Sequence, residues 1–215
     1  MKASTQSLRF LLVVLIVPLA AYVPLRYWFT HQRRLPVYRS LTAAMLAAPA
    51  PDTAGGTPVL LNQYGRPFSL DSLRGRISVV EFFFSSCISQ CPKMNRGMKV
   101  LSGKFALDPG VQLLSFTVDP EHDSPARLLS YSRQMGFVGP RWYFITGTKS
   151  WIYRLARQAF GIVALDAPPA SYDFIHSPQW TLLDARGRIR GYYSGVSKSD
   201  RDQIVLDIQK LEHEN

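Results

Sequence analysis

The chain begins with one long apolar segment and continues with shorter apolar runs of strand length. Phe10 to Leu25 is an unbroken apolar run of sixteen residues, bounded by Arg9 and Arg26. If both arginines extend outward, residues 8–29 reach the length of about 20 residues that a membrane-spanning helix needs. Aromatic residues near its downstream end suit a membrane interface. We therefore predict one N-terminal transmembrane helix within a membrane anchor over residues 1–34.

A cleaved signal peptide is the alternative for this segment. Lys2 and Arg9 give it a basic start, and small residues stand at positions 20 and 21. The apolar run continues through Tyr22 and Val23, so a cleavage site is poorly formed and we favour an uncleaved anchor. Basic residues flank the run on both sides, and their charge alone leaves its orientation open.

The next segment, residues 35–57, is rich in Ala, Pro, Gly and Thr. This composition predicts a flexible tether, with a short helix around Leu41 to Ala48. Residues 58–215 follow as one domain, a length sufficient for a sizeable core.

Strand-like and helix-like patterns alternate along this domain. Residues 77–84 and 111–118 are nearly all apolar, as in strands buried on both faces of a parallel sheet. The order is a hairpin, then strand and helix in alternation, then an antiparallel pair and a final helix, which predicts an α/β, thioredoxin-like central sheet flanked by helices. The other expected elements are strands at 59–61, 67–70, 142–145, 179–184 and 189–193, and helices at 92–107, 125–135, 150–160 and 199–211.

Composition narrows the class of protein. The formal net charge is +10, but the basic residues are scattered and no nucleic-acid motif accompanies them. We expect a solvated basic surface, with docking on an acidic partner or a membrane surface as the alternative, and no nucleic-acid partner. The two cysteines, Cys87 and Cys91, exclude a disulfide-rich scaffold.

The two cysteines stand where the strand at 77–84 gives way to a helix. Pro92 fits the first turn of that helix, which places Cys91 at its boundary and Cys87 in the preceding loop. Helix N–H groups and the macrodipole favour a thiolate there, so we expect both sulfurs to be nucleophilic or metal-binding. The spacing is CxxxC rather than the CxxC of dithiol oxidoreductases.

The donor set favours one metal. Two thiolates select soft ions, namely Cu(I), zinc or iron–sulfur. Two ligands are too few for the tetrahedral coordination that zinc prefers. An iron–sulfur cluster needs four cysteines, and the sequence has two. Cu(I) accepts two sulfurs and one imidazole. His122, in an acidic turn, and His176, just before the strand at 179–184, are the candidates, whereas His31 and His213 are expected to be solvated.

Three segments together resemble the Sco/SenC family of copper-binding proteins. They are the Phe82–Phe84 strand leading into Cys87, Cys91 and Pro92; residues 116–125 (FTVDPEHDSP), which resemble the family's S-V-D-P-E-x-D-T-P; and His176-Ser177 followed by residues 182–188 (LLDARGR). The resemblance runs from about Gln63 to Leu211.

The resemblance implies a function and a location. Family members bind copper through two cysteines and a histidine and assist assembly of the CuA centre of cytochrome c oxidase, so Cys87, Cys91 and His176 become the implied ligands of Cu(I), with Cu(II) left open. The implied partner is the oxidase subunit carrying CuA or another copper chaperone. The implied location is the inner (cytoplasmic or mitochondrial) membrane, single-pass, with the soluble domain on the periplasmic or intermembrane side.

The chain departs from the family pattern around the ligands. Ile88 and Ser89 replace the usual Pro and acidic or amide residue after the first cysteine, and Ile175 replaces the Asp that often precedes the histidine. Such neighbouring groups tune metal affinity. Met94 and Met98, two soft sulfurs at helical spacing, are expected in the core rather than in a copper relay.

Other functions stay open at this point. A thiol–disulfide oxidoreductase that reduces the cysteines of an apo-oxidase subunit or another extracytoplasmic protein would use Cys87 and Cys91 as a redox-active pair and would not need His176. A peroxidase is less favoured. It would need a single peroxidatic cysteine with a nearby Arg or a Gln–Trp arrangement, and the sequence shows no clear match. Asp119 is expected to close a turn rather than to orient the site.

Overall fold

The computed structural model describes residues 14, 16, 18, 20–27, 34–49, 59–136, 140–162 and 178–214. The chain forms two compact units, Met1–Leu35 and Pro36–Asn215. In the first unit residues 20–27 are helical. Much of the predicted transmembrane helix lies outside the described residues, and no helix among those described is both long and apolar enough to cross a membrane.

In the part of the second unit that the structure describes, the strands form a seven-stranded sheet of order β1-β7-β6-β3-β4-β5-β2. Its central strands run parallel. Strand β3 (Ile77–Phe83) pairs in parallel with β4 (Val111–Thr117), and β4 pairs in parallel with β5 (Trp142–Thr146). All the residues of β3 and β4 are buried, as their apolar sequences predicted. On the other side of β3, β6 (Gln179–Leu183) runs antiparallel and pairs with β7 (Arg188–Ser194).

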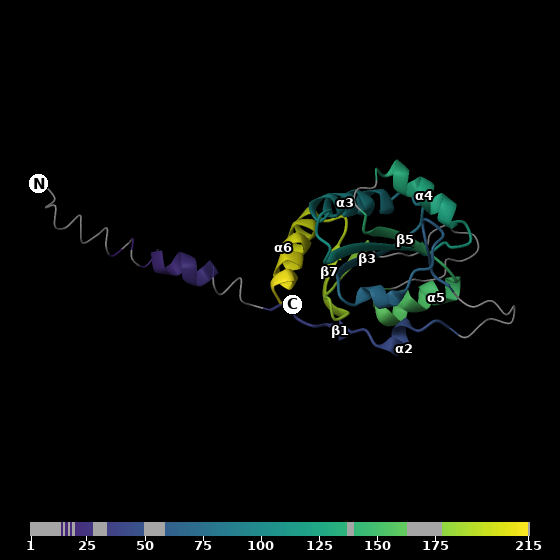
Figure 1. Cartoon of the computed structure of the whole chain (residues 1–215). Helices are drawn as coiled ribbons and strands as arrows, with labels where there is room; N and C mark the ends of the chain where they lie inside the picture. Colours follow the sequence, from purple (N-terminus) through teal and green to yellow (C-terminus); the bar gives the residue numbers. More distant parts are fainter. Residues whose placement is uncertain are drawn as a thin grey trace, which may run out of the picture. The chain divides into compact units, whose positions relative to one another are not determined.

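Helices cover both faces of this sheet (Figure 1). On one face lie α3 (Cys91–Lys104) and α4 (Pro125–Gln134), and on the other lies α5 (Lys149–Arg154). The chain continues from α5 into a π-helical turn, η2 (Leu155–Ala159), and ends in α6 (Lys198–Glu214). The predicted α/β thioredoxin-like architecture is confirmed.

Neighbouring residues of β3 point to opposite faces, as strand geometry requires. Phe82 packs on Phe160, which follows η2 directly, with ring centroids 5.5 Å apart. Phe83 packs on Tyr131 of α4, also with centroids 5.5 Å apart. Odd-numbered residues of β3 therefore face α4 and its neighbour α3. The same strand carries the chain directly into the cysteine loop.

Within the segment predicted as a flexible tether, the structure describes residues 36–49. Strand β1 (Arg39–Ser40) pairs antiparallel with β7, and the backbone N–H of Tyr38 donates to the carbonyl of Ile189 at 2.9 Å. The predicted short helix is present as α2 (Ala43–Leu46), with Thr42 as its N-cap. Residues 36–49 thus lie in the same compact unit as the domain, and the backbone of residues 38–41 extends one edge of its sheet.

The predicted N-terminal hairpin is smaller than expected. β2 (Leu61–Asn62) pairs with β5, and residues 59–70 fold back through one isolated bridge, Leu61 with Pro67. Gly65 turns the chain with a positive φ of 71°. Residues expected as the end of the second hairpin strand instead begin a 3₁₀ turn, η1 (Leu70–Leu73), capped by the Ser69 hydroxyl.

Candidate metal centre

The two cysteines lie at the start of α3, as predicted. Cys91 is the first residue of the helix and fully buried, and Cys87 is buried in the loop before it. No disulfide joins them. The backbone N–H of Cys91 donates to the Cys87 sulfur at an N···S distance of 3.4 Å. The turn therefore brings both sulfurs to one helix terminus, with Pro92 in the first turn as expected.

The protonation of Cys91 differs from the prediction. The hydrogen bond with Cys87 and burial together raise the pKa of the Cys91 thiol, while a backbone hydrogen bond involving Phe84 acts in the opposite direction. The helix terminus alone favours a thiolate, but a second buried sulfur beside it disfavours another negative charge. Burial and the neighbouring sulfur therefore favour the protonated thiol of Cys91, and a cation that neutralises the pair would stabilise the thiolate.

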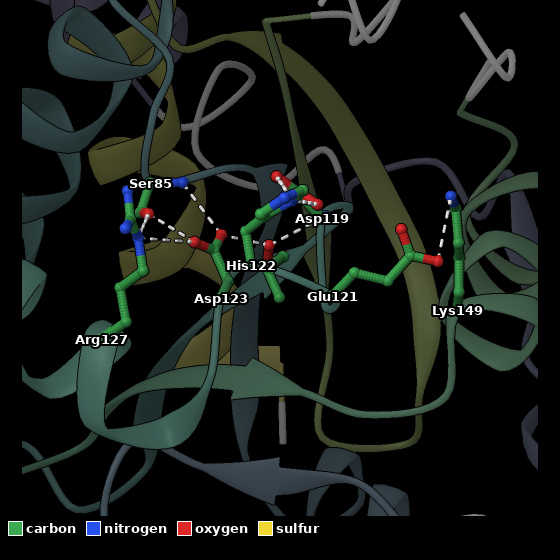
Figure 2. A network of polar contacts seen from close by, with 8 residues as sticks. Ser85, Asp119, Glu121, His122, Asp123, Arg127 and Lys149 are labelled. Atoms are coloured by element: carbon green, nitrogen blue, oxygen red, sulfur yellow. Dashed lines mark hydrogen bonds and ion pairs between the residues drawn. The ribbon is translucent and has the colours of Figure 1, made fainter. Parts of the chain in front are cut away.

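The loop after β4 holds the cysteine loop in place (Figure 2). The buried carboxylate of Asp123 accepts a hydrogen bond of 2.9 Å from the backbone N–H of Ser85 and a second from the Ser85 hydroxyl. Thr117 donates its hydroxyl to the same carboxylate at 2.5 Å. Arg127 closes the network through its Nε, which donates to the Ser85 hydroxyl at 2.8 Å. Asp123 therefore fixes the backbone two residues before Cys87.

Sequence reasoning did not identify Asp123, Ser85 or Thr117 as site residues. A usable signal was present, because Thr117 and Asp123 both lie in the segment that resembled the Sco/SenC motif. Their contact with the cysteine loop depends on the parallel pairing of β3 with β4, which places the ends of both strands at one edge of the sheet.

Asp119 closes the turn that His122 occupies, as expected (Figure 2). Its carbonyl accepts from the backbone N–H groups of His122 and Asp123. Its carboxylate lies 2.8 Å from Nδ1 of His122, and this contact raises the pKa of the imidazole. The His122 side chain is 69% exposed.

The residues between the cysteines are accessible. Ile88 is 95% exposed, and Ser89 and Gln90 are also exposed. The Ser89 hydroxyl lies 3.7 Å from the Cys87 sulfur. The departure of this chain from the family pattern therefore places an apolar side chain at the tip of the loop and a hydroxyl beside one thiol.

The structure brings together two of the three predicted ligands. His176 and Ile175 lie outside the described residues. Among the residues that are described, no group of three or more His, Cys, Asp or Glu side chains could hold a metal ion. Met94 and Met98 are fully buried, as predicted for core residues, and His213 is exposed on α6.

Comparison with known proteins decides the family. The sequence model described as SCO1/SenC matches residues 47–213. The chain belongs to the SCO1/SenC family. It is 31% identical over 150 residues to the SCO1 protein homolog of Bacillus subtilis (strain 168), covering 69% of this chain and 77% of that relative.

Solved structures of the SCO1/SenC family share this fold. BsSco, described as a member of the Sco family of cytochrome c oxidase assembly proteins with a disulfide switch, superposes with a TM-score of 0.67 at 26% identity, covering 83% of this chain and 98% of that chain. Yeast Sco1 with copper bound gives a TM-score of 0.55 at 26% identity, covering 72% and 88%.

Proposed function

We propose that this SCO1/SenC protein is a Cu(I)-binding metallochaperone that assists assembly of the CuA centre of cytochrome c oxidase. The observation that carries the proposal is the pair of buried sulfurs of Cys87 and Cys91 on one helix terminus, in a chain of this family. Copper binding by yeast Sco1 and oxidase assembly by the family of BsSco support it.

The chemistry of the donors fits Cu(I). Thiolates are soft ligands and Cu(I) is a soft ion with low coordination numbers. The bound ion would supply the positive charge that two adjacent thiolates need in a buried setting. His176 is the proposed third ligand. The buried Asp123 would keep the Cys87 loop in one conformation as copper enters and leaves.

The location follows from the same proposal. We place the N-terminal segment in the inner (cytoplasmic or mitochondrial) membrane as a single-pass anchor and the Pro36–Asn215 domain on the periplasmic or intermembrane side. The proposed partner is the oxidase subunit that carries CuA or another copper chaperone. The scattered positive charge of the chain, +10 overall, suits an acidic partner surface.

The proposed function is tested by oxidase assembly in cells. A strain lacking this protein is supplied with wild type, Cys87→Ser, Cys91→Ser or His176→Ala, and the CuA centre of the oxidase is measured spectroscopically. Loss of CuA in all three variants supports copper delivery. Normal CuA in either cysteine variant contradicts it.

Thiol–disulfide exchange is the second candidate function. The adjacent sulfurs of Cys87 and Cys91 favour it, as does the disulfide switch described for BsSco. It requires both cysteines but no imidazole. Full CuA assembly by His176→Ala, together with loss in both cysteine variants, would establish this function in place of metal delivery.

A further inference from the structure

Helix α3, which begins at Cys91, carries four basic residues and no acidic residue. The four are Lys93, Arg96, Lys99 and Lys104, and all of them are exposed. At 3.6 residues per turn their side chains fall on one side of the helix, opposite the residues that pack on the sheet. These four residues are called the basic face of α3 below.

The positive charge of the basic face is not neutralised within the domain. None of its four cations forms an ion pair within the part of the chain that the structure describes. Helix α4 packs beside α3 (Figure 1), and its sequence, PARLLSYSRQ, also contains no acidic residue. Helix α6 is different, because there Lys198 pairs with Asp202 at 2.6 Å and Lys210 pairs with Asp207 at 3.0 Å.

This arrangement of charges lowers the stability of α3. Lys93 is the third residue of the helix, and the helix macrodipole disfavours a cation in the first turn. Lys93, Arg96 and Lys99 follow one another at i, i+3 spacing, so their like charges repel. Lys99 has a local compensation, because it lies at the end of α4, where a Cβ on Gly136 would be 2.6 Å from its ammonium nitrogen. For Lys93 and Arg96 the fold provides no such compensation among the described residues.

The basic face begins at the thiol pair. Cys91 and Lys93 lie in the same first turn of α3, so the first cation is within one turn of the buried sulfurs. Two exposed apolar side chains adjoin the charges. Ile88 is 95% exposed at the tip of the cysteine loop, and Val100 is 68% exposed between the cations of the helix. Apolar side chains with a polar and charged surround are typical of protein–protein interfaces.

From this geometry we infer that the basic face of α3 and the tip of the cysteine loop form the docking surface for an acidic protein that exchanges copper with the thiol pair. The inference rests on the proposed function and specifies the surface through which the partner reaches the metal site. Carboxylates of the partner supply the negative charge that α3 lacks, and Ile88 becomes buried on docking. The unlike charges accelerate association, most strongly at low ionic strength.

Association kinetics with the metal-free CuA-bearing domain of the oxidase subunit test the inference on the full-length chain. The α3 double variant, Lys93→Glu with Arg96→Glu, reverses two charges of the basic face. At low ionic strength it should associate about tenfold or more slowly than wild type, and its rate should depend less on salt concentration. An association rate equal to that of wild type would overturn the inference.

A second double variant, Arg74→Glu with Arg186→Glu, is the matched control for net charge. Both arginines are exposed, in two turns joined by a hydrogen bond of 2.7 Å from the backbone N–H of Gly75 to the carbonyl of Ala185. These turns lie at the start of β3, at the opposite edge of the sheet from the cysteine loop. The control should associate within about twofold of wild type. Equal slowing in both double variants would show that only the net charge matters, and would also overturn the inference.

The apolar part of the surface is tested by Ile88→Ser, with Leu107→Ser as its control. Leu107 is 96% exposed, like Ile88, but follows the other end of α3. Ile88→Ser should dissociate from the CuA domain about threefold or more faster than wild type, because an apolar side chain no longer becomes buried. Leu107→Ser should match wild type. Equal dissociation rates for the two variants would remove the cysteine loop from the docking surface and contradict the inference.

Urea denaturation separates docking from folding. The α3 double variant places an acidic residue in the first turn, so its urea midpoint should equal or exceed that of wild type. A lower midpoint would mean that Lys93 and Arg96 stabilise the fold, and would contradict the inference.

Vesicles and copper titration separate the other outcomes. If the α3 double variant binds vesicles of phosphatidylglycerol and phosphatidylcholine more weakly than wild type, yet associates normally with the CuA domain, the basic face contacts a lipid surface and the inference is wrong. Absence of Cu(I) binding by wild type would refute the proposed function. Charge-dependent association of the two metal-free proteins would still support the docking surface in that case.

Discussion

The carboxylate of Asp123 accepts a hydrogen bond of 2.9 Å from the backbone N–H of Ser85, 38 residues earlier in the chain. This contact joins the loop after β4 to the loop that carries Cys87 (Figure 2). Backbone N–H groups in such loops need a partner when they are shielded from water. The Asp123 carboxylate supplies it while also accepting from Thr117.

Asp123→Ala should therefore destabilise the domain. It leaves the Ser85 N–H and the Thr117 hydroxyl without their acceptor, so we expect a loss of about 2 to 4 kcal/mol in the free energy of unfolding. Urea denaturation measures it. Glu121→Gln is the control in the same loop, because the Glu121 side chain is 65% exposed and its carboxylate lies 3.6 Å from the ammonium group of Lys149, a surface ion pair of little energetic weight. A loss in Glu121→Gln as large as in Asp123→Ala would contradict the assigned role of the buried carboxylate.

Glu81 gives the free energy of unfolding a specific pH dependence. Its pKa is about 7 in the folded state against 4.5 ordinarily, so the folded protein binds more protons between these values. The contribution of Glu81 to stability is greatest below about pH 4.5 and falls as pH rises through 7, by at most about 3 kcal/mol.

Glu81→Gln should remove this fall, because a glutamine has no charge to bury. The difference in unfolding free energy between Glu81→Gln and wild type should grow in favour of the variant from pH 5 to pH 8. Chemical denaturation at a series of pH values measures it. Parallel curves for the two proteins would show that Glu81 does not titrate in this range.

Two glycines of α3 give a prediction about helix packing. A Cβ at Gly97 would lie 2.5 Å from the Trp180 ring, whose Nε1 is bonded to Glu81, whereas Gly103 has no heavy atom within 4 Å of that position. Gly97→Ala should cost about 1 to 3 kcal/mol through overpacking. Gly103→Ala should be neutral or stabilising by up to about 1 kcal/mol, because alanine favours a helix.

Thermal or urea unfolding of the two alanine variants compares them directly. Gly97→Ala should also weaken Cu(I) binding, because Cys91 begins the helix that must shift away from Trp180. If Gly97→Ala were as stable as Gly103→Ala, the Trp180 indole would have to move aside at little cost. That result would contradict the view that its hydrogen bond to Glu81 holds the ring in place.

Local patterns predicted the part of the site that depends on local structure. The apolar run of β3 predicted a buried strand, and Pro92 placed Cys91 at the helix boundary. The helix predicted at 125–135 is present as α4, where the Ser124 hydroxyl accepts from the backbone N–H of Arg127 at 3.3 Å. Each of these depends on neighbours within one helical turn.

Long-range features were not predictable in the same way. The raised pKa of Cys91 comes from burial and a second sulfur, which outweigh the helix terminus that the sequence indicated. Glu81 did give a local signal, a charged residue in an apolar strand, but its position under α3 depends on Trp180, 99 residues away. The docking of β1 escaped prediction because Arg39 and Ser40 are exposed, and their pairing with β7 is made by backbone groups that leave no apolar pattern in the sequence.

The central claim, a Cu(I) site of two thiolates and the imidazole of His176, is tested most directly by Cu(I) titration against a competing chelator. Wild type should bind one ion per chain, Cys87→Ser and Cys91→Ser should lose tight binding, and His176→Ala should bind about tenfold or more weakly. His122→Ala, the control histidine held by Asp119, should match wild type. Unchanged affinity in His176→Ala, or loss of binding in His122→Ala, would contradict the proposed ligand set.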